Sequence, residues 1–259
     1  THSYMKMLYK YPHDAYPYQD LIDENRRRGA DQLEYEILDT GVFDDNRYFD
    51  VYVEYAKHTP DDIVMRVTVE NRADQRAALH LLPQFWARNR WAWSGKPGKP
   101  LLTLESNAEG ACVVAQNPAL GTMIVTASAQ QPIEWIFCEN ETNVRRIFGI
   151  DGAGPFKDGF NDYLVDGDEQ AIRRDKGTRA AAHVYLQFTP HERSVLYLRW
   201  RPEPAPAAAP DDVPLDMEEL FARRQAEADE FYAALQHDIP DADARLVPVS
   251  YTHLTLPTI

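Results

Sequence analysis

The sequence is poor in cysteine, in positive charge and in long apolar runs, and each shortage excludes a class of protein. Two cysteines in 259 residues, Cys112 and Cys138, are too few to build a disulfide scaffold. Both lie in strand-like stretches, where a buried free thiol is the ordinary state of cysteine. We therefore predict two buried free thiols.

The shortage of positive charge argues against nucleic acid and anionic membranes as partners. With 27 Lys and Arg residues against 41 Asp and Glu residues, the net charge is −14, which repels phosphate groups at long range. Apolar runs such as "LHLLP" and "TMIVTA" are far shorter than the roughly 20 residues that cross a bilayer. The chain starts at Thr1, so any targeting segment lies upstream, and we predict a cytoplasmic location with neither a nucleic-acid nor a membrane partner.

The common catalytic motifs are also missing. The eight histidines include no HxH or HExxH spacing, and the chain has no G-x-S-x-G, P-loop or G-x-G-x-x-G sequence. His183, in "AAHVYL", is expected to be a half-buried strand residue. We predict no metal, no cofactor and no catalytic residue within this chain.

A hydrophobic period of two residues dominates the first two hundred positions or so. The segments "YFDVYVEYAK" (48–57) and "DIVMRVTVEN" (62–71) each place apolar side chains on one face, and "HTPDD" between them predicts a hairpin. Similar segments, including "LEYEIL" (33–38), recur to Arg201, giving about ten strands. This pattern predicts a mainly β fold, a large antiparallel β-sandwich over residues 33–201. Residues 1–32, with the short helix "YQDLIDENRRR", are expected to form an aromatic lead-in packed on it.

The composition changes sharply after the last expected strand. Residues 202–214, "PEPAPAAAPDDVP", are rich in proline, which can neither pair in a sheet nor continue a helix. Beyond this linker, "LDMEELFARRQAEADEFYAALQ" places apolar residues at helical spacing, with Asp216 as the expected N-cap. Residues 215–247 are therefore predicted to hold one amphipathic helix, and such a helix needs a partner surface.

The densest aromatic patch is "FWARNRWAWSG" (85–95). Tryptophan faces stack on sugar rings, and arginine and asparagine donate hydrogen bonds to hydroxyl groups. We take Arg88, Asn89, Trp91 and Trp93 as candidates for a substrate pocket or an interdomain contact, and assign Trp86 to the core. Core packing with a domain contact explains the patch as well, because Trp and Arg are also enriched at protein interfaces.

Two other stretches allow a functional and a structural interpretation. In "FCENETN", Glu139 and Glu141 share one face of a strand end and could be an acid and base, but a hydrogen-bonded turn is the better interpretation. The stretch "GFNDYLVDGDEQAI" (159–172) is expected to be a long connection. Sandwich loops often carry function, although surface acidity explains its aspartates equally well.

The runs "THSYMKMLYKYPHDAYPYQDLIDENRRR", "EYEILDTGVFDDNRYFDVYVEYAK" and "LHLLPQFWARNRWAW" closely resemble the N-terminal region of long bacterial glucosidases. These are relatives of glycoside hydrolase family 63, which includes processing mannosyl-oligosaccharide glucosidase. The likeness continues through "ENETN", "FNDYLVDG", "GTRAAAH" and "EADEFYAAL", to about residue 247. Members usually carry His where this chain has Asn161.

The resemblance implies a two-domain enzyme with an N-terminal super-sandwich, a helical linker and an (α/α)6 barrel. In that family a carboxylic acid and a carboxylate in the barrel invert the anomeric centre. The barrel would be the missing C-terminal partner of this chain, and the carbohydrate substrate would bind to the intact enzyme. The fragment alone is expected to be inactive.

The last residues, 248–259 ("PVSYTHLTLPTI"), resemble a widely used transposon adapter of shotgun sequencing, translated in frame. We expect them to be library sequence that contributes nothing to the fold. The sequence thus predicts the non-catalytic N-terminal domain of an inverting α-glucosidase-type glycoside hydrolase, acting on oligosaccharides or small glucosides. The alternative is a stand-alone carbohydrate-binding or interaction sandwich.

Overall fold

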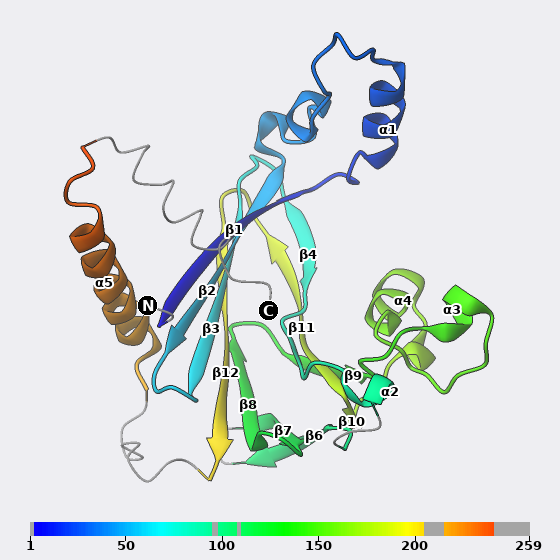
Figure 1. Cartoon of the computed structure of the whole chain (residues 1–259), viewed down its shortest axis with the longest axis vertical. Coiled ribbons are helices and arrows are strands. Elements are labelled where there is room, and N and C mark those ends of the chain that lie inside the picture. The colour runs from blue at the N-terminus through cyan, green and yellow to red at the C-terminus, as the bar shows by residue number, and fades with distance from the viewer. Residues whose placement is uncertain (1–2, 95–97, 108–109, 205–214, 241–259) are drawn as a thin grey trace.

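A computed structural model describes residues 3–94, 98–107, 110–204 and 215–240. It shows two antiparallel sheets packed face to face, with a helix against the outer face of the larger one (Figure 1). The prediction of a mainly β fold, a large antiparallel β-sandwich followed by one amphipathic helix, is confirmed. Ten of the thirteen positions in the Pro-rich linker, 205–214, and the C-terminal residues 241–259 lie outside the described residues.

The large sheet has eight strands in the order β1-β2-β3-β12-β8-β7-β6-β10. Its hairpin β2–β3 forms at "HTPDD", as predicted, because short apolar-alternating runs flank a turn-rich link. The strands are β1 (Tyr4–Pro12), β2 (Tyr48–Lys57), β3 (Ile63–Asn71), β6 (Leu101–Asn107), β7 (Gly110–Asn117), β8 (Gly121–Ala129), β10 (Lys176–Gly177) and β12 (Arg193–Glu203).

The small sheet is built around one long strand, β11 (Arg179–Phe188). The second half of β11 pairs with β4 (Ala77–Leu81), and its first half pairs with β5 (Gln84–Trp86) and β9 (Glu134–Cys138) on its two sides. Pro83 separates β4 from β5, because proline has no N–H to give to a sheet. β5 is therefore short, and it contains the first two residues of the aromatic patch, Phe85 and Trp86.

The main core lies between the two sheets. Side chains at alternate positions of β2 and β3 point into it, among them Phe49, Val67 and Val69, as the period of two predicted. β11 contributes Val184 and Phe188 from the opposite side. Both cysteines are buried thiols outside any disulfide among the described residues, as predicted, and burial raises the pKa of the Cys138 thiol to about 12.

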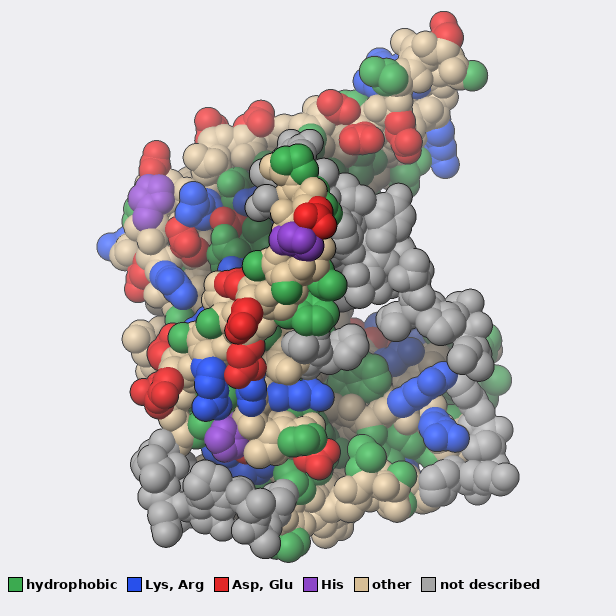
Figure 2. Space-filling model, turned by 60° about the vertical axis from the view of Figure 1, so that its left-hand side comes forward, with side chains coloured by type: hydrophobic (Ala, Val, Ile, Leu, Met, Phe, Trp, Pro, Cys, Tyr) green, Lys and Arg blue, Asp and Glu red, His purple; other side chains and the backbone are tan. Residues whose placement is uncertain are grey.

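Helix α5 (Met217–Leu235) covers the outer face of the large sheet near β1 and β2 (Figure 1). Asp216 caps it as predicted, since its side chain accepts a hydrogen bond from the Glu219 N–H at 3.0 Å. Leu220 and Phe221 are buried in a small cluster with Val64 of β3. Figure 2, which brings this side forward, shows acidic and basic side chains interspersed over the face around the helix.

Residues 13–47 form an arm that projects from the sandwich (Figures 1 and 2) and contains α1 (Tyr18–Arg27), η1 (Ile37–Thr40) and η2 (Asp44–Asn46). The arm is held internally by polar contacts, such as the 2.9 Å hydrogen bond that Asn25 Nδ2 donates to the Tyr35 carbonyl. The predicted helix is confirmed as α1, but it has no buried residue and does not pack on the sandwich.

Two boundaries from the sequence are corrected by the structure. The sandwich begins at Tyr4, in β1, instead of at residue 33, because an edge strand exposed on both faces shows no alternation of apolar and polar residues. The predicted strand at "LEYEIL" is wrong. Leu33 there is 88% exposed and pairs with no strand among the described residues, while Glu36 and Asp39 form a capping box that starts η1 instead.

The stretch from residue 139 to 175 folds over the outer face of the small sheet. It contains α3 (Val144–Phe148), α4 (Gly159–Asp166) and η3 (Glu169–Ala171). The predicted long connection at 159–172 is therefore wrong in part, because Phe160 packs against Ile136 and Ala181 and stabilises a short helix. Gly159 must be glycine, since a Cβ there would lie 2.0 Å from the Ala171 carbonyl oxygen.

Candidate functional site

The aromatic patch leaves the small sheet at one end of the sandwich. β5 pairs with the start of β11, with Trp86 opposite Arg179, and the chain then runs through residues 87–90 into the short helix α2 (Trp91–Ser94). Because β5 has only three residues, the segment that follows depends on side-chain hydrogen bonds for its position.

Two of the predicted site residues provide those hydrogen bonds. Asn89 Nδ2 donates to the Asn140 carbonyl at 2.8 Å, and its Oδ1 accepts from the Ala92 N–H at 3.1 Å. Trp91 Nε1 donates to Glu141 Oε1 at 3.0 Å. In the opposite direction, Asn140 Nδ2 donates to the Ala87 carbonyl at 3.1 Å. Asn89 and Trp91 therefore fix the segment to residues 139–141, which leaves them less free to contact a ligand.

Glu139 is the centre of the polar cluster beneath this segment. Its side chain is 11% exposed and accepts hydrogen bonds from Arg173 at 2.7 Å and from the Thr178 hydroxyl at 3.0 Å. Lys99 Nζ lies 2.9 Å from an oxygen of Glu139 and 2.9 Å from one of Glu141. Burial alone would raise the pKa of the Glu139 carboxyl, but the hydrogen bonds from Lys99, Thr178 and Arg173 outweigh it and hold that pKa below its usual range.

Two members of this cluster, Glu139 and Glu141, were considered in the sequence analysis. The sequence favoured a hydrogen-bonded turn at "FCENETN"; the structure has a bend at residues 140–141, followed by α3, which Asn143 Oδ1 caps by accepting the Arg146 N–H at 3.0 Å. Lys99 and Arg173 carried no signal in the sequence, because they come from distant loops. A Cβ on Gly177 would lie 2.5 Å from the Cys138 carbonyl oxygen, so glycine is needed for this close approach just before Thr178.

Of the two remaining candidates, Arg88 is the one whose side chain the structure describes. Arg88 is exposed and forms no hydrogen bond or ion pair with the part of the chain that the structure describes. The Trp93 side chain lies outside the described residues. The assignment of Trp86 to the core is wrong, because its side chain is 50% exposed. Arg179 contacts the Trp86 ring, with the guanidinium carbon 5.8 Å from the ring centroid.

Trp86 borders a cleft of about 470 Å³ at the open end between the two sheets. Phe85 and Trp200 add aromatic surface, and Asp61, Gln116 and Asn117 place a carboxylate and two amides at its border. Apolar rings with a few polar groups at the edge are typical of sites that stack a sugar ring and bind its hydroxyl groups. Arg88, two residues after Trp86, is exposed but is not among the residues that line this cleft.

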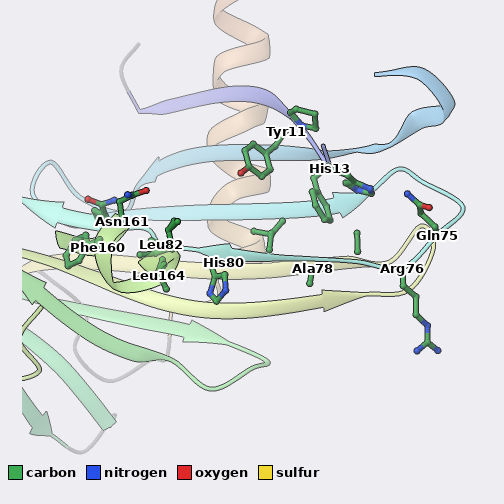
Figure 3. Close-up of a pocket in the computed structure, with 16 residues that line it drawn as sticks. Tyr11, His13, Gln75, Arg76, Ala78, His80, Leu82, Phe160, Asn161 and Leu164 are labelled. Atoms are coloured by element: carbon green, nitrogen blue, oxygen red, sulfur yellow. The ribbon is translucent and has the colours of Figure 1, made fainter. Parts of the chain in front are cut away.

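A second cleft, of about 670 Å³, follows the unpaired edge of β4 (Figure 3). It extends from Asn161 and Leu164 of α4 to His13, just after β1. His13 Nε2 is buried and has no hydrogen-bond partner among the described residues. Burial and the nearby Arg47 charge lower the pKa of His13, so this imidazole is neutral at pH 7. Asn161 is exposed at the cleft.

Among the described residues, no group of three or more His, Cys, Asp or Glu side chains is placed to hold a metal ion. Within the same residues, none of the helices combines the length and apolar character needed to cross a bilayer.

No protein-family model matches the chain. The chain is similar to the uncharacterized protein YMR196W of Saccharomyces cerevisiae. The two are 31% identical over an alignment 273 residues long, which covers 90% of this chain. The chain spans about a quarter of the length of that curated relative, 25%.

Proposed function

We propose that this chain is the non-catalytic β-sandwich domain of an inverting α-glucosidase-type glycoside hydrolase related to family 63. The long strings quoted above support the family, and the sandwich followed by a helix agrees with the architecture that it implies. In this proposal the acid and base lie in a separate barrel of a longer protein. In this proposal the protein is cytoplasmic, where buried thiols such as those of Cys112 and Cys138 stay reduced.

The observation that carries the proposal is the cleft at Trp86. A half-exposed tryptophan in a mainly apolar cleft, with two amides and a carboxylate at its border, suits an uncharged sugar that stacks its ring and hydrogen-bonds through its hydroxyl groups. Asn89 and Trp91 hold the neighbouring segment in place from behind. The domain would thus supply one wall of the substrate pocket, and the barrel would supply the other.

The carboxylates of this cluster do not fit the roles of acid and base. An inverting glycosidase needs a general acid of raised pKa and a second carboxylate about 6.5–9.5 Å away, with water between them. Glu139 has a lowered pKa and lies under Lys99 and Arg173. Glu141 shares the same lysine. Both carboxylates therefore serve the structure of the loop, which supports placing the chemistry elsewhere.

Trp86→Ala should weaken the binding of maltotriose to this chain by about tenfold, because it removes the stacking surface but no buried group. Arg88→Ala should weaken it less, by about threefold, through the loss of one exposed donor. Isothermal titration calorimetry measures both. Neither variant should change the thermal midpoint by more than a few degrees.

Leu120→Ala is the matched control. Leu120 is 71% exposed and borders the same cleft but offers no ring face or polar group. Equal affinity of the wild type and the Trp86→Ala variant would show that the cleft is not the sugar site.

The stand-alone binding module is the second candidate, and the same cleft supports it. The two functions differ in what the longer protein does. Hydrolysis of an α-glucoside by the protein that the complete reading frame encodes, with no hydrolysis by the 259-residue chain, supports the enzyme. Sugar binding without hydrolysis in both supports the binding module.

A further inference from the structure

Three polar side chains form a hydrogen-bonded row on the outer face of the small sheet, away from the Trp86 cleft. His80 Nδ1 lies 2.8 Å from His183 Nε2, and His183 Nδ1 lies 3.1 Å from Glu134 Oε2. They come from neighbouring strands β4, β11 and β9, with His183 directly opposite Glu134. Leu79 and Val184, next to the two histidines in sequence, point into the core, so both imidazoles project to the other face.

The hydrogen bonds determine where the protons are. Arg174 forms an ion pair with Glu134, which keeps that carboxylate charged and able only to accept. His183 must therefore donate from Nδ1, and its Nε2 is left as an acceptor. His80 then donates from Nδ1 to His183. His80 Nε2 is then the acceptor at the end of the row, and it belongs to an exposed side chain.

The surroundings keep this acceptor neutral. Burial and the neighbouring His183 lower the pKa of His80, and burial lowers the pKa of His183, so both are uncharged at pH 7. Arg174 forms ion pairs with Glu134 and Glu169. Its charge is therefore paired at the Glu134 end of the row, opposite His80.

An aromatic ring stands beside the acceptor. Tyr185 is directly opposite His80 in the strand register, its ring centroid is 4.7 Å from that of His80, and its side chain is 48% exposed. Further along the same face, Gln187 is exposed and lies opposite the small Ala78, which leaves room above the strands. Figure 3 shows His80 and Ala78 pointing away from Tyr11 and His13.

We propose that the outer face of β4 and β11 is a second binding site, for an uncharged ring compound that carries hydroxyl groups, such as a sugar. Tyr185 provides the stacking surface, His80 Nε2 accepts a hydrogen bond from a ligand hydroxyl, and Gln187 donates or accepts a second one. Glu134 and His183 are positioning residues that fix the His80 tautomer. This site is independent of the Trp86 cleft and of the glycosidase proposal.

The proton arrangement is tested first, by long-range ¹H–¹⁵N NMR of the wild-type chain at pH 7. We expect protonated Nδ1 and unprotonated Nε2 in both histidines. His183→Phe should let the two tautomers of His80 mix, because its fixed partner is gone. A wild-type His80 protonated at Nε2 would overturn the proposal.

Binding is then measured by titrating maltotriose while following the His80 and Tyr185 signals, in the Trp86→Ala background so that the first cleft does not contribute. Tyr185→Ala and His80→Phe should each weaken binding by about tenfold, the first through lost stacking and the second through a lost hydrogen bond. Both side chains are exposed, so both variants should fold. Tyr9→Ala, which removes a tyrosine that is 50% exposed on β1, should bind like its parent.

Three results would overturn the site. The sugar could leave the His80 and Tyr185 signals unmoved at tens of millimolar, or it could bind with the same affinity in Tyr185→Ala and His80→Phe. Alternatively, micromolar Zn²⁺ could shift the His80 signals while maltotriose does not, and the face would then be a metal-binding surface instead.

Discussion

Replacing Arg66 by alanine should lower the free energy of unfolding by about 3–5 kcal/mol, because it leaves the buried Glu54 carboxylate without its cation. The side chains of Arg66 and Glu54 are 12% and 6% exposed, and two hydrogen bonds join them at 2.9 and 3.0 Å. Burial by itself would raise the pKa of Glu54, but the hydrogen bonds from Arg66 and Tyr4 lower it. Urea unfolding followed by circular dichroism measures the change.

The same substitution should loosen α5. Arg66 also donates to Glu218 at 2.8 Å, and its guanidinium carbon lies 4.3 Å from the centroid of the Phe221 ring. These contacts and the buried Leu220 attach the helix to the large sheet. We therefore expect amide hydrogen exchange of α5 to accelerate more than that of β2.

Arg146→Ala is the matched control. Arg146 pairs with Asp158 at 2.7 Å and with Asp162 at 3.0 Å, but its side chain is 56% exposed, so its loss should cost less than about 1 kcal/mol. Similar losses in the two variants would show that burial does not distinguish the two ion pairs.

Glu139→Gln should lower the free energy of unfolding by about 2–3 kcal/mol at pH 7, because Lys99 and Arg173 then face each other without a carboxylate between them. The Glu139 pKa is lower in the folded state than in the unfolded state. Between these two pKa values the unfolded state therefore binds more protons than the folded state. The stabilisation is complete above the unfolded pKa of about 4.3, and is lost as the pH falls through the folded value. The gap between wild type and variant should therefore shrink on acidification.

Urea midpoints at pH 7 and pH 3 measure this gap. Glu227→Gln serves as the control, since Glu227 is 44% exposed and pairs with Arg224 of the same helix, and its effect should be small at both pH values. A gap for Glu139→Gln that stays the same size at both pH values would mean that its charge does not stabilise the loop.

Much of the sandwich could be predicted because its strands are buried on one face. Phe49 and Val69 alternate with polar neighbours, and that alternation exists only because the sheet has a core side. β1 was not predicted, since an edge strand with exposed Tyr9 and Tyr11 lacks such a face. α4 was also missed, because eight residues are too few to show a helical period.

The sequence singled out the segment at residues 85–95 as a candidate site but did not predict its arrangement. Trp86 is exposed instead of buried, and Asn89 is hydrogen-bonded to the backbone of Asn140. Spacing in sequence does not say which polar group finds an internal partner. The row from Glu134 through His183 to His80 was missed for the same reason, since its members are distant along the chain and meet only in the sheet.

The most direct test of the proposed function is ¹H NMR of the first product released from an aryl α-glucoside by the complete reading frame that contains this chain. We expect β-glucose to appear first and mutarotate afterwards, because an inverting enzyme uses water on the opposite face of the sugar. We also expect no turnover by the 259-residue chain alone. Release of α-glucose first, turnover by the chain alone, or no hydrolysis by the complete protein would contradict the assignment to an inverting glucosidase.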